Sequence, residues 1–238
     1  MAVDTWGCFV FVNLSPNPRP VREWLGDLPQ RLGRHPLHEL KLVRRAPSRI
    51  QANWKLIAEN FMEYYHLPWV HLDGGYHVNT VHPALSGVLD YKNYRTEIAG
   101  QTSVQISPLK PADPGDDAAV GAVRTGSEAM YWFVFPNFML NLYEGMMDTN
   151  LVLPLGPDRC RVVFDFYFAQ TEGPEAERFM TESMAVADRI QQEDMGICEE
   201  VQRGLASRSF HTGRFSVRRE AAGYRFHQLL ARRLLASC

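Results

Sequence analysis

The sequence contains little of what several classes of protein need. Only four of its 238 residues are cysteine, and none forms a Cys-x-x-Cys pair, so a disulfide framework or a zinc knuckle is not expected. Charged residues, proline or glycine interrupt every apolar run, and the first residues lack a signal-peptide pattern. The net charge is −2 with no basic block. We therefore expect a cytoplasmic protein with no membrane or nucleic-acid partner.

Short strand-like runs occupy the middle of the chain, and a long helix follows them. The expected strands are 7–14, 44–53, 102–106, 130–135, 139–143, 148–153 and 161–168. The first of these has no preceding strand to pair with. Apolar periodicity predicts helices over 174–205 and 220–236. Closely spaced strands followed by one long helix predict an α+β fold, in which an antiparallel sheet curves around a helix.

The segment from Asn53 to His71 contains the strongest functional signal. A helix is expected from Asn53 to His66, because Pro68 disfavours helical backbone in the residue before it. Glu63 and His66 then share one helix face. On a continuous helix His71 would point about 140° away from His66. The break at Pro68 lets the chain turn, so that both imidazoles can reach one metal ion.

Two imidazoles and one distant carboxylate are the ligand set of non-haem Fe(II) sites with open positions for oxygen. Histidines near helix ends also act as hydrogen-bonding groups, and His77 and His82 make a histidine-rich loop an alternative interpretation. Glu63 could accept a hydrogen bond from a ligand imidazole or be a solvated glutamate. Asn60 could reach the open side of the metal or bind backbone.

Asp194 is the best candidate for the distant carboxylate. On a helical wheel it lies at the centre of an apolar stripe, whereas Glu193 lies about 100° away at the edge. The stripe consists of Met180, Ala187, Ile190, Ile197, Cys198 and Val201. A carboxylate on a buried face costs several kcal/mol unless it is paired or bound to a cation. The alternative is an aspartate that pairs with an arginine or caps backbone.

Several of these motifs resemble a known family. The pattern Asn53-Trp54-Lys55, Glu59-Asn60 and Glu63-x-x-His66-x4-His71 resembles the catalytic-domain signature of Rieske non-haem iron oxygenase α subunits. That family includes aromatic-ring-hydroxylating enzymes and a choline/carnitine monooxygenase-like branch. Residues 135–143 and 153–157 look like its pocket strands, and residues 192–205 look like the segment with the carboxylate ligand.

The resemblance implies a helix-grip fold with mononuclear Fe(II) inside and O2 as co-substrate. His66, His71 and Asp194 match the iron ligands, and Glu63 matches the acidic residue that bridges toward the electron-donating cluster. The Cys-x-His and Cys-x-x-His pairs of a Rieske domain do not occur in this sequence. We therefore expect one catalytic domain over residues 1–238, with 1–20 as a residual strand and linker. Either the sequence is a truncated form of a longer protein, or the [2Fe–2S] centre and reductase act from another chain. The family implies a ring-shaped trimer.

The implied reaction is hydroxylation of a small organic substrate, either an aromatic ring or a quaternary ammonium compound. The catalytic candidates are Asn60 and Glu63. The candidates for the substrate pocket are Trp132, Val134, Asn141, Tyr143 and Glu144. Aromatic side chains suit either substrate, through stacking or cation–π contact, and Glu144 favours a cation. Ordinary sheet core is the alternative for all five. Two other functions stay open: a non-enzymatic helix-grip ligand-binding protein, and a histidine-lined zinc or iron hydrolase.

Overall fold

A seven-stranded antiparallel sheet forms the centre of the protein. The structure is a computed structural model that describes residues 1–70, 93–109, 123 and 125–236. The strand order is β3-β9-β8-β7-β6-β5-β4. The strands are β3 (Lys41–Ile50), β4 (Arg95–Ala99), β5 (Thr102–Pro108), β6 (Glu128–Val134), β7 (Phe138–Tyr143), β8 (Met146–Gly156) and β9 (Arg159–Phe168). The expected strands of the sheet are confirmed within a few residues, and β4 is an addition to them.

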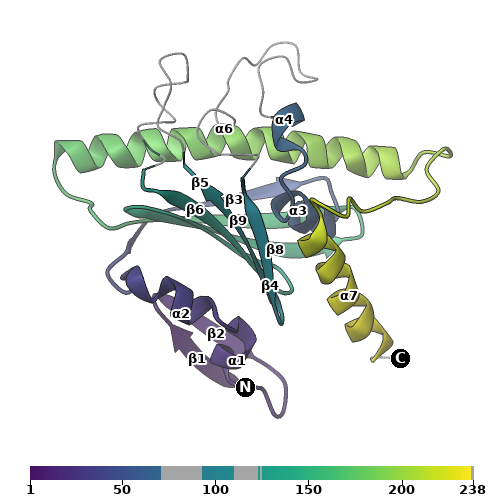
Figure 1. Ribbon diagram of the computed structural model, residues 1–238, viewed down its shortest axis with the longest axis horizontal. Coiled ribbons are helices and arrows are strands. Elements are labelled where there is room, and N and C mark those ends of the chain that lie inside the picture. The colour runs from purple at the N-terminus through teal and green to yellow at the C-terminus, as the bar shows by residue number, and fades with distance from the viewer. Residues whose placement is uncertain (71–92, 110–122, 124, 237–238) are drawn as a thin grey trace.

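The long helix α6 (Pro174–Leu205) crosses one face of the curved sheet, as Figure 1 shows. Its bounds agree with the prediction, because its apolar stripe is long and regular. Met180, Ala187, Ile190 and Cys198 of that stripe are buried, and they pack with the sheet in one core cluster. The expected α+β architecture, an antiparallel sheet wrapped against a long helix, is therefore confirmed.

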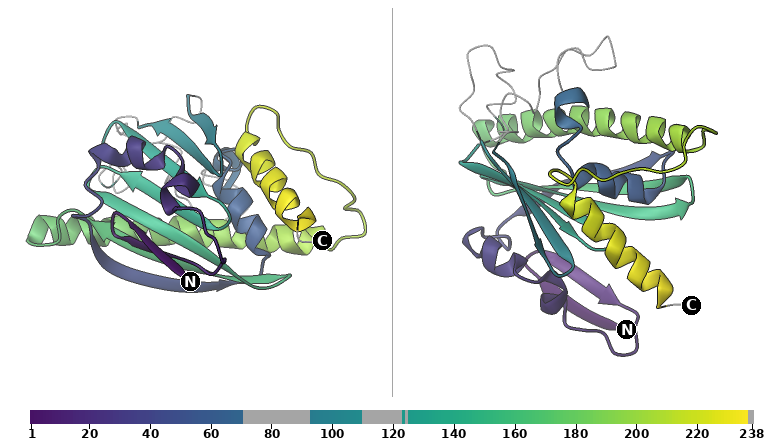
Figure 2. Two further views of the ribbon diagram at one scale, coloured as in Figure 1. Left: turned by 90° about the horizontal axis from the view of Figure 1, so that it is seen from below. Right: turned by 45° about the vertical axis from the view of Figure 1, so that its right-hand side comes forward.

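The N-terminal segment lies on the opposite face of the sheet (Figures 1 and 2). Strands β1 (Ala2–Trp6) and β2 (Phe9–Asn13) form a separate hairpin, and Phe9 packs against rings of the sheet. Three short helices follow: α1 (Val21–Leu25), α2 (Leu28–Arg31) and η1 (Leu32–Arg34). The expectation that strand 7–14 has no preceding partner was wrong, because β1 pairs with it along its whole length.

The segment with the metal-site motif folds as two helices rather than one. Asn53 is the N-cap of helix α3 (Trp54–Phe61), and its side chain accepts a hydrogen bond from the Lys55 amide at 3.0 Å. The helix ends several residues before the predicted end at His66. A short helix α4 (Leu67–Val70) follows, with Pro68 in its first turn, where proline needs no helical partner. Pro68 therefore starts a helix here and does not end one.

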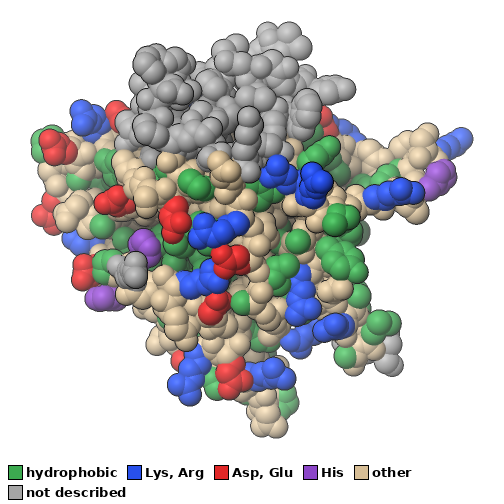
Figure 3. Space-filling view, in the orientation of Figure 1, with side chains coloured by type: hydrophobic (Ala, Val, Ile, Leu, Met, Phe, Trp, Pro, Cys, Tyr) green, Lys and Arg blue, Asp and Glu red, His purple; other side chains and the backbone are tan. Residues whose placement is uncertain are grey.

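The C-terminal helix α7 (Ala221–Leu235) packs beside α3 and the edge of the sheet (Figure 2). Its Phe226 is 1% exposed and contacts the rings of Trp54, Phe133 and Phe135. Charged side chains of both signs are spread over the face drawn in Figure 3, with hydrophobic side chains between them. No helix in the described part of the chain is long and apolar enough to cross a membrane.

Candidate metal centre and substrate cavity

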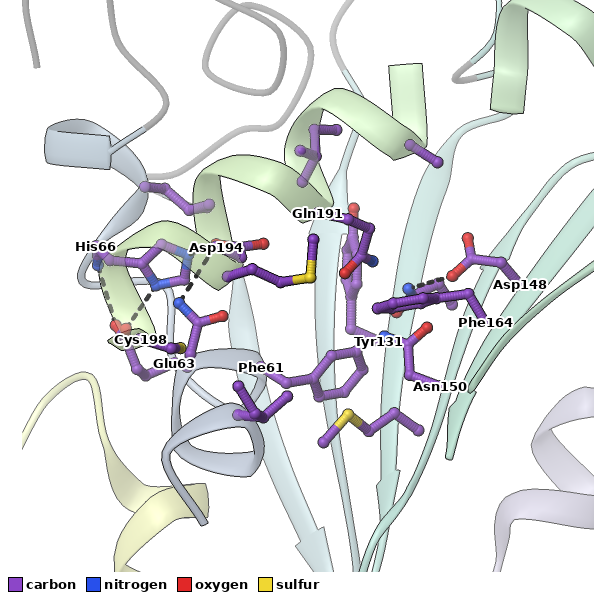
Figure 4. A pocket seen from close by; sticks show the side chains of 18 of the residues that line it. Phe61, Glu63, His66, Tyr131, Asp148, Asn150, Phe164, Gln191, Asp194 and Cys198 are labelled. Carbon is purple, nitrogen blue, oxygen red and sulfur yellow. Dashed lines mark hydrogen bonds and ion pairs between the residues drawn. The ribbon is translucent and has the colours of Figure 1, made fainter. Parts of the chain in front are cut away.

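A cavity of about 90 Å³ lies between the sheet and helices α3 and α6. Figure 4 shows His66 and Asp194 at one end, and Asp148 and Asn150 at the other, with Tyr131 between them. Separate parts of the chain therefore supply its walls: helix α3 with the bend after it, the strands β3 and β6 to β9, and the inner face of α6.

Glu63 fixes the orientation of the His66 ring. Glu63 Oε1 lies 2.5 Å from His66 Nδ1, and Glu63 Oε2 accepts hydrogen bonds from the backbone amides of Tyr65 and His66. A carboxylate can only accept at Nδ1, so the ring is held as the tautomer with its proton there. His66 Nε2 points away from Glu63, as in metal sites where a carboxylate orients a histidine ligand.

Asp194 approaches the other nitrogen of that ring, Nε2. Asp194 Oδ1 lies 3.5 Å from His66 Nε2, and the two side chains are 21% and 15% exposed. Two ligand atoms that bind one ion at about 2.1 Å and near right angles are about 3 Å apart, so this spacing fits a shared metal ion. The Asn60 amide donates to Asp194 Oδ1 at 3.3 Å, which places Asn60 beside the same oxygen.

His71, the other expected ligand, lies outside the described residues, as do His77 and His82. Within the described part of the chain, no group of three His, Cys, Asp or Glu side chains is placed to hold a metal. The structure therefore brings together His66, Asp194, Glu63 and Asn60 of the predicted site. The complete ligand set stays a prediction.

Aromatic side chains form much of the cavity wall. They are Phe61, Tyr64, Tyr131, Tyr143 and Phe164. The hydroxyls of Tyr131 and Tyr143 lie 2.6 Å apart, and burial raises the pKa of Tyr64 well above its ordinary value. Tyr64 therefore stays a neutral phenol, and its ring packs 5.6 Å from that of Tyr131.

Two of the expected pocket residues, Asn141 and Tyr143, line this cavity, and three do not. Trp132 and Val134 are buried in the core cluster on the opposite face, beneath the N-terminal helices. Glu144 lies in the turn after β7, beside a separate surface hollow. Side chains alternate between the two faces of a strand, so choosing Trp132 on β6 selected the wrong face. We correct the predicted pocket by removing these three.

The cavity contains residues that the sequence reasoning missed. They are Tyr131, Asp148, Asn150, Phe164 and Gln191. A signal for two of them, Asp148 and Asn150, was present in the pattern of the strands. They are polar residues two apart, so they share one face of a strand, although Thr149 between them is polar too. Polar residues on one face of a buried strand indicate a lined cavity rather than close-packed core.

Two cysteines near this cavity should resist alkylation in the folded protein. Burial raises the pKa of Cys160 to about 11, and it also raises that of Cys198, which lines the cavity. At pH 8 a thiol with a pKa of about 11 is roughly one part in a thousand thiolate, the reactive form. Iodoacetamide at pH 8, followed by peptide mass spectrometry, should label the exposed Cys8 and leave Cys160 and Cys198 unlabelled until the protein is denatured. Rapid labelling of either buried thiol in the native protein would contradict this packing.

Comparison with known proteins identifies the family of this chain. Residues 37–236 match the family model described as the ring hydroxylating alpha subunit (catalytic domain). The chain is 38% identical to the chloroplastic choline monooxygenase of Arabidopsis thaliana, over 97% of this chain and 53% of the relative. It is 28% identical to the carnitine monooxygenase oxygenase subunit of Escherichia coli K12, over 96% of this chain and 60% of the relative. The chain thus spans about half to three-fifths of the length of these relatives.

Solved structures share the fold. A quaternary ammonium Rieske monooxygenase aligns over 97% of this chain and 61% of its own, with a TM-score of 0.80 and 22% identity. Naphthalene 1,2-dioxygenase from Rhodococcus aligns over 87% of this chain and 54% of its own, with a TM-score of 0.61 and 20% identity. The helix-grip fold expected from the resemblance is confirmed. The chain belongs to the ring-hydroxylating oxygenase alpha-subunit family, and the part that matches is the catalytic domain.

Proposed function

We propose that this chain is the catalytic domain of a non-haem Fe(II) oxygenase that oxidises a small quaternary ammonium compound. The observation that supports it is the Glu63–His66–Asp194 arrangement at one end of an aromatic-walled cavity. Residues 1–238 would form one catalytic domain, with the N-terminal hairpin and short helices packed on the outer face of the sheet.

In this proposal His66 Nε2 and the Asp194 carboxylate hold the iron, with His71 as the third ligand. The ferrous ion supplies the binding and activation of O2. The protein's own groups prepare the site. Glu63 keeps the proton of the His66 ring on Nδ1, and the Asn60 amide holds Asp194 Oδ1. The apolar walls limit the access of water to the reacting atoms.

The cavity favours a cationic substrate over a plain hydrocarbon ring. Five aromatic rings line it, and the faces of such rings attract quaternary ammonium groups. The described lining also includes three carboxylates, Glu63, Asp148 and Asp194, and no lysine or arginine. With Fe(II) bound, the ion would offset the charges of Glu63 and Asp194, so Asp148 is the acid that remains to attract a cation. The names of the sequence relatives, choline and carnitine monooxygenases, point to the same class.

Electrons would come from a Rieske [2Fe–2S] centre on another polypeptide, together with its reductase. We assign Glu63 to the electron-transfer path between that centre and His66. It binds the ligand imidazole through Oε1, and its Oε2 is held by two backbone amides of the same bend. A ring-shaped homotrimer, in which the donor comes from a neighbouring subunit, is part of this proposal.

Oxygen consumption tests the proposal. The chain is loaded with Fe(II) anaerobically, then supplied with a Rieske protein, a reductase and NADH, with choline or carnitine as substrate. We expect substrate-dependent uptake of O2 and an oxidised product, and neither when iron or the Rieske protein is omitted. Tight binding of quaternary ammonium compounds without iron binding or turnover would instead favour the non-enzymatic ligand-binding protein. Product formed under strict anaerobiosis would favour a hydrolase.

A further inference from the structure

Strand pairing gathers three polar side chains in the cavity, and Figure 4 shows two of them, Asp148 and Asn150, at the end away from the proposed metal site. Asn141 of β7 pairs directly with Asp148 of β8, and Asn150 lies two residues further along β8, on the same face. All three line the cavity. They are 8%, 4% and 5% exposed, respectively, so their polar atoms are almost removed from bulk water.

Two oxygen atoms in this cluster have no hydrogen-bond donor. The Asn141 amide donates to Asp148 Oδ2 at 2.7 Å, which fixes the orientation of that amide and leaves Asn141 Oδ1 without a partner. Asn150 Oδ1 is also buried without a partner. Buried polar atoms are nearly always satisfied in folded proteins, so two unpaired acceptors that line one cavity indicate a ligand with a donor group.

We propose that Asn141 and Asn150 select a substrate with a hydroxyl group, which donates to their free oxygens at this end of the cavity. The inference rests on the proposed function and deepens it, because it names the substrate as a quaternary ammonium alcohol rather than a quaternary ammonium acid. A carboxylate has no proton to donate, and it would face Asn141 Oδ1, whose orientation is fixed by the bond to Asp148, and the Asp148 carboxylate itself. The trimethylammonium group lies against the aromatic wall.

Three ligands with the same cationic group isolate the role of the hydroxyl. Choline carries a hydroxyl, ethyltrimethylammonium lacks it, and glycine betaine has a carboxylate in its place. Calorimetric titration of the Fe(II)-loaded chain under anaerobic conditions measures each dissociation constant without turnover. We expect choline to bind about ten-fold more tightly than ethyltrimethylammonium, because one or two hydrogen bonds are gained, and glycine betaine to bind most weakly.

The variant Asn150→Leu replaces the amide with an apolar side chain of similar size. Because the Asn150 oxygen has no protein partner to lose, we expect the variant to fold, and its preference for choline over ethyltrimethylammonium should fall about five-fold. Asn150→Asp keeps an acceptor and should retain the preference. Thr149→Val is the matched control, since Thr149 is 4% exposed on the same strand but faces the opposite side of the sheet.

The outcomes separate this inference from the proposed function. Equal binding of choline and ethyltrimethylammonium by the wild type overturns the inference. So does a preference that Asn150→Leu leaves unchanged, or tighter binding of glycine betaine. Each of these leaves iron-dependent oxidation intact. If the wild-type chain takes up no iron, the proposed function is removed. The same titrations on the iron-free chain then still decide the inference, by whether the hydroxyl preference depends on Asn150.

Discussion

The Asp194→Ala variant should lose its iron. The change removes one of the two described donors of the proposed site, and it leaves His66 Nε2 without the oxygen that lies 3.5 Å away. Loss of a residue that only orients a metal ligand typically lowers metal affinity 10- to 100-fold, so loss of a ligand should lower it about 100-fold or more. Iron per chain in anaerobically purified protein, measured by mass spectrometry of the metal, should fall from near one to near zero. Oxygen uptake with the Rieske donor should be lost with it.

Glu193→Gln is the control for this experiment. Glu193 is the neighbouring acid on α6, and it is not among the residues that line the cavity. The control variant should retain its iron, and circular dichroism should show that both variants keep their helices. Undiminished iron in Asp194→Ala would show that this carboxylate is not a ligand. The assignment of a metal centre between α6 and the bend after α3 would then be wrong.

Among the single-substitution variants proposed for this chain, Phe226→Ala should have the lowest free energy of unfolding. Phe226 is 1% exposed and joins α7 to α3 and to the sheet through edge contacts with Trp54 and Phe133. Truncating a buried phenylalanine lowers the free energy of unfolding by about 3–5 kcal/mol. In a chain of this length that corresponds to a fall in Tm of roughly 6–20 °C, which calorimetry or thermal circular dichroism measures.

Arg232→Ala on the same helix provides the comparison. Arg232 is exposed in the last turn of α7, so its removal should change the free energy of unfolding by less than about 0.5 kcal/mol. If Phe226→Ala also melted within a few degrees of the wild type, α7 would not be part of the core that we describe. The pair therefore tests the packing of the C-terminal helix independently of any ligand.

The secondary structure was largely predictable from the sequence, and the reason is local. The bounds of α6 agree with the prediction because a helical apolar stripe repeats over many turns. Strands β5 to β9 were found because turn residues separate short apolar runs. The errors in the predicted secondary structure occur where the local sequence only weakly favours a helix or a strand. The helix at Asn53 ended at Phe61, and the strand β1 was missed beside β2.

Part of the site was also predictable. Asp194 was chosen from its place in the apolar stripe of one helix, and Glu63 and His66 from their spacing. These three side chains do meet in the structure, although Glu63 and His66 reach one another across a bend and not along a helix. The choice of Trp132 and Val134 failed, because the pattern of β6 is apolar on both faces and does not say which face lies under α6.

The sequence by itself determined the elements, the fold class and the types of side chain available for a metal site. These follow from periodicity, spacing and chemical type, which are properties of neighbouring residues. Only the tertiary structure decided which face of each strand lines the cavity, and that Asn141, Asp148 and Asn150 meet at one end of it. Strand register and the placement of a helix over one face depend on packing between residues far apart in the chain. No local pattern contains that information.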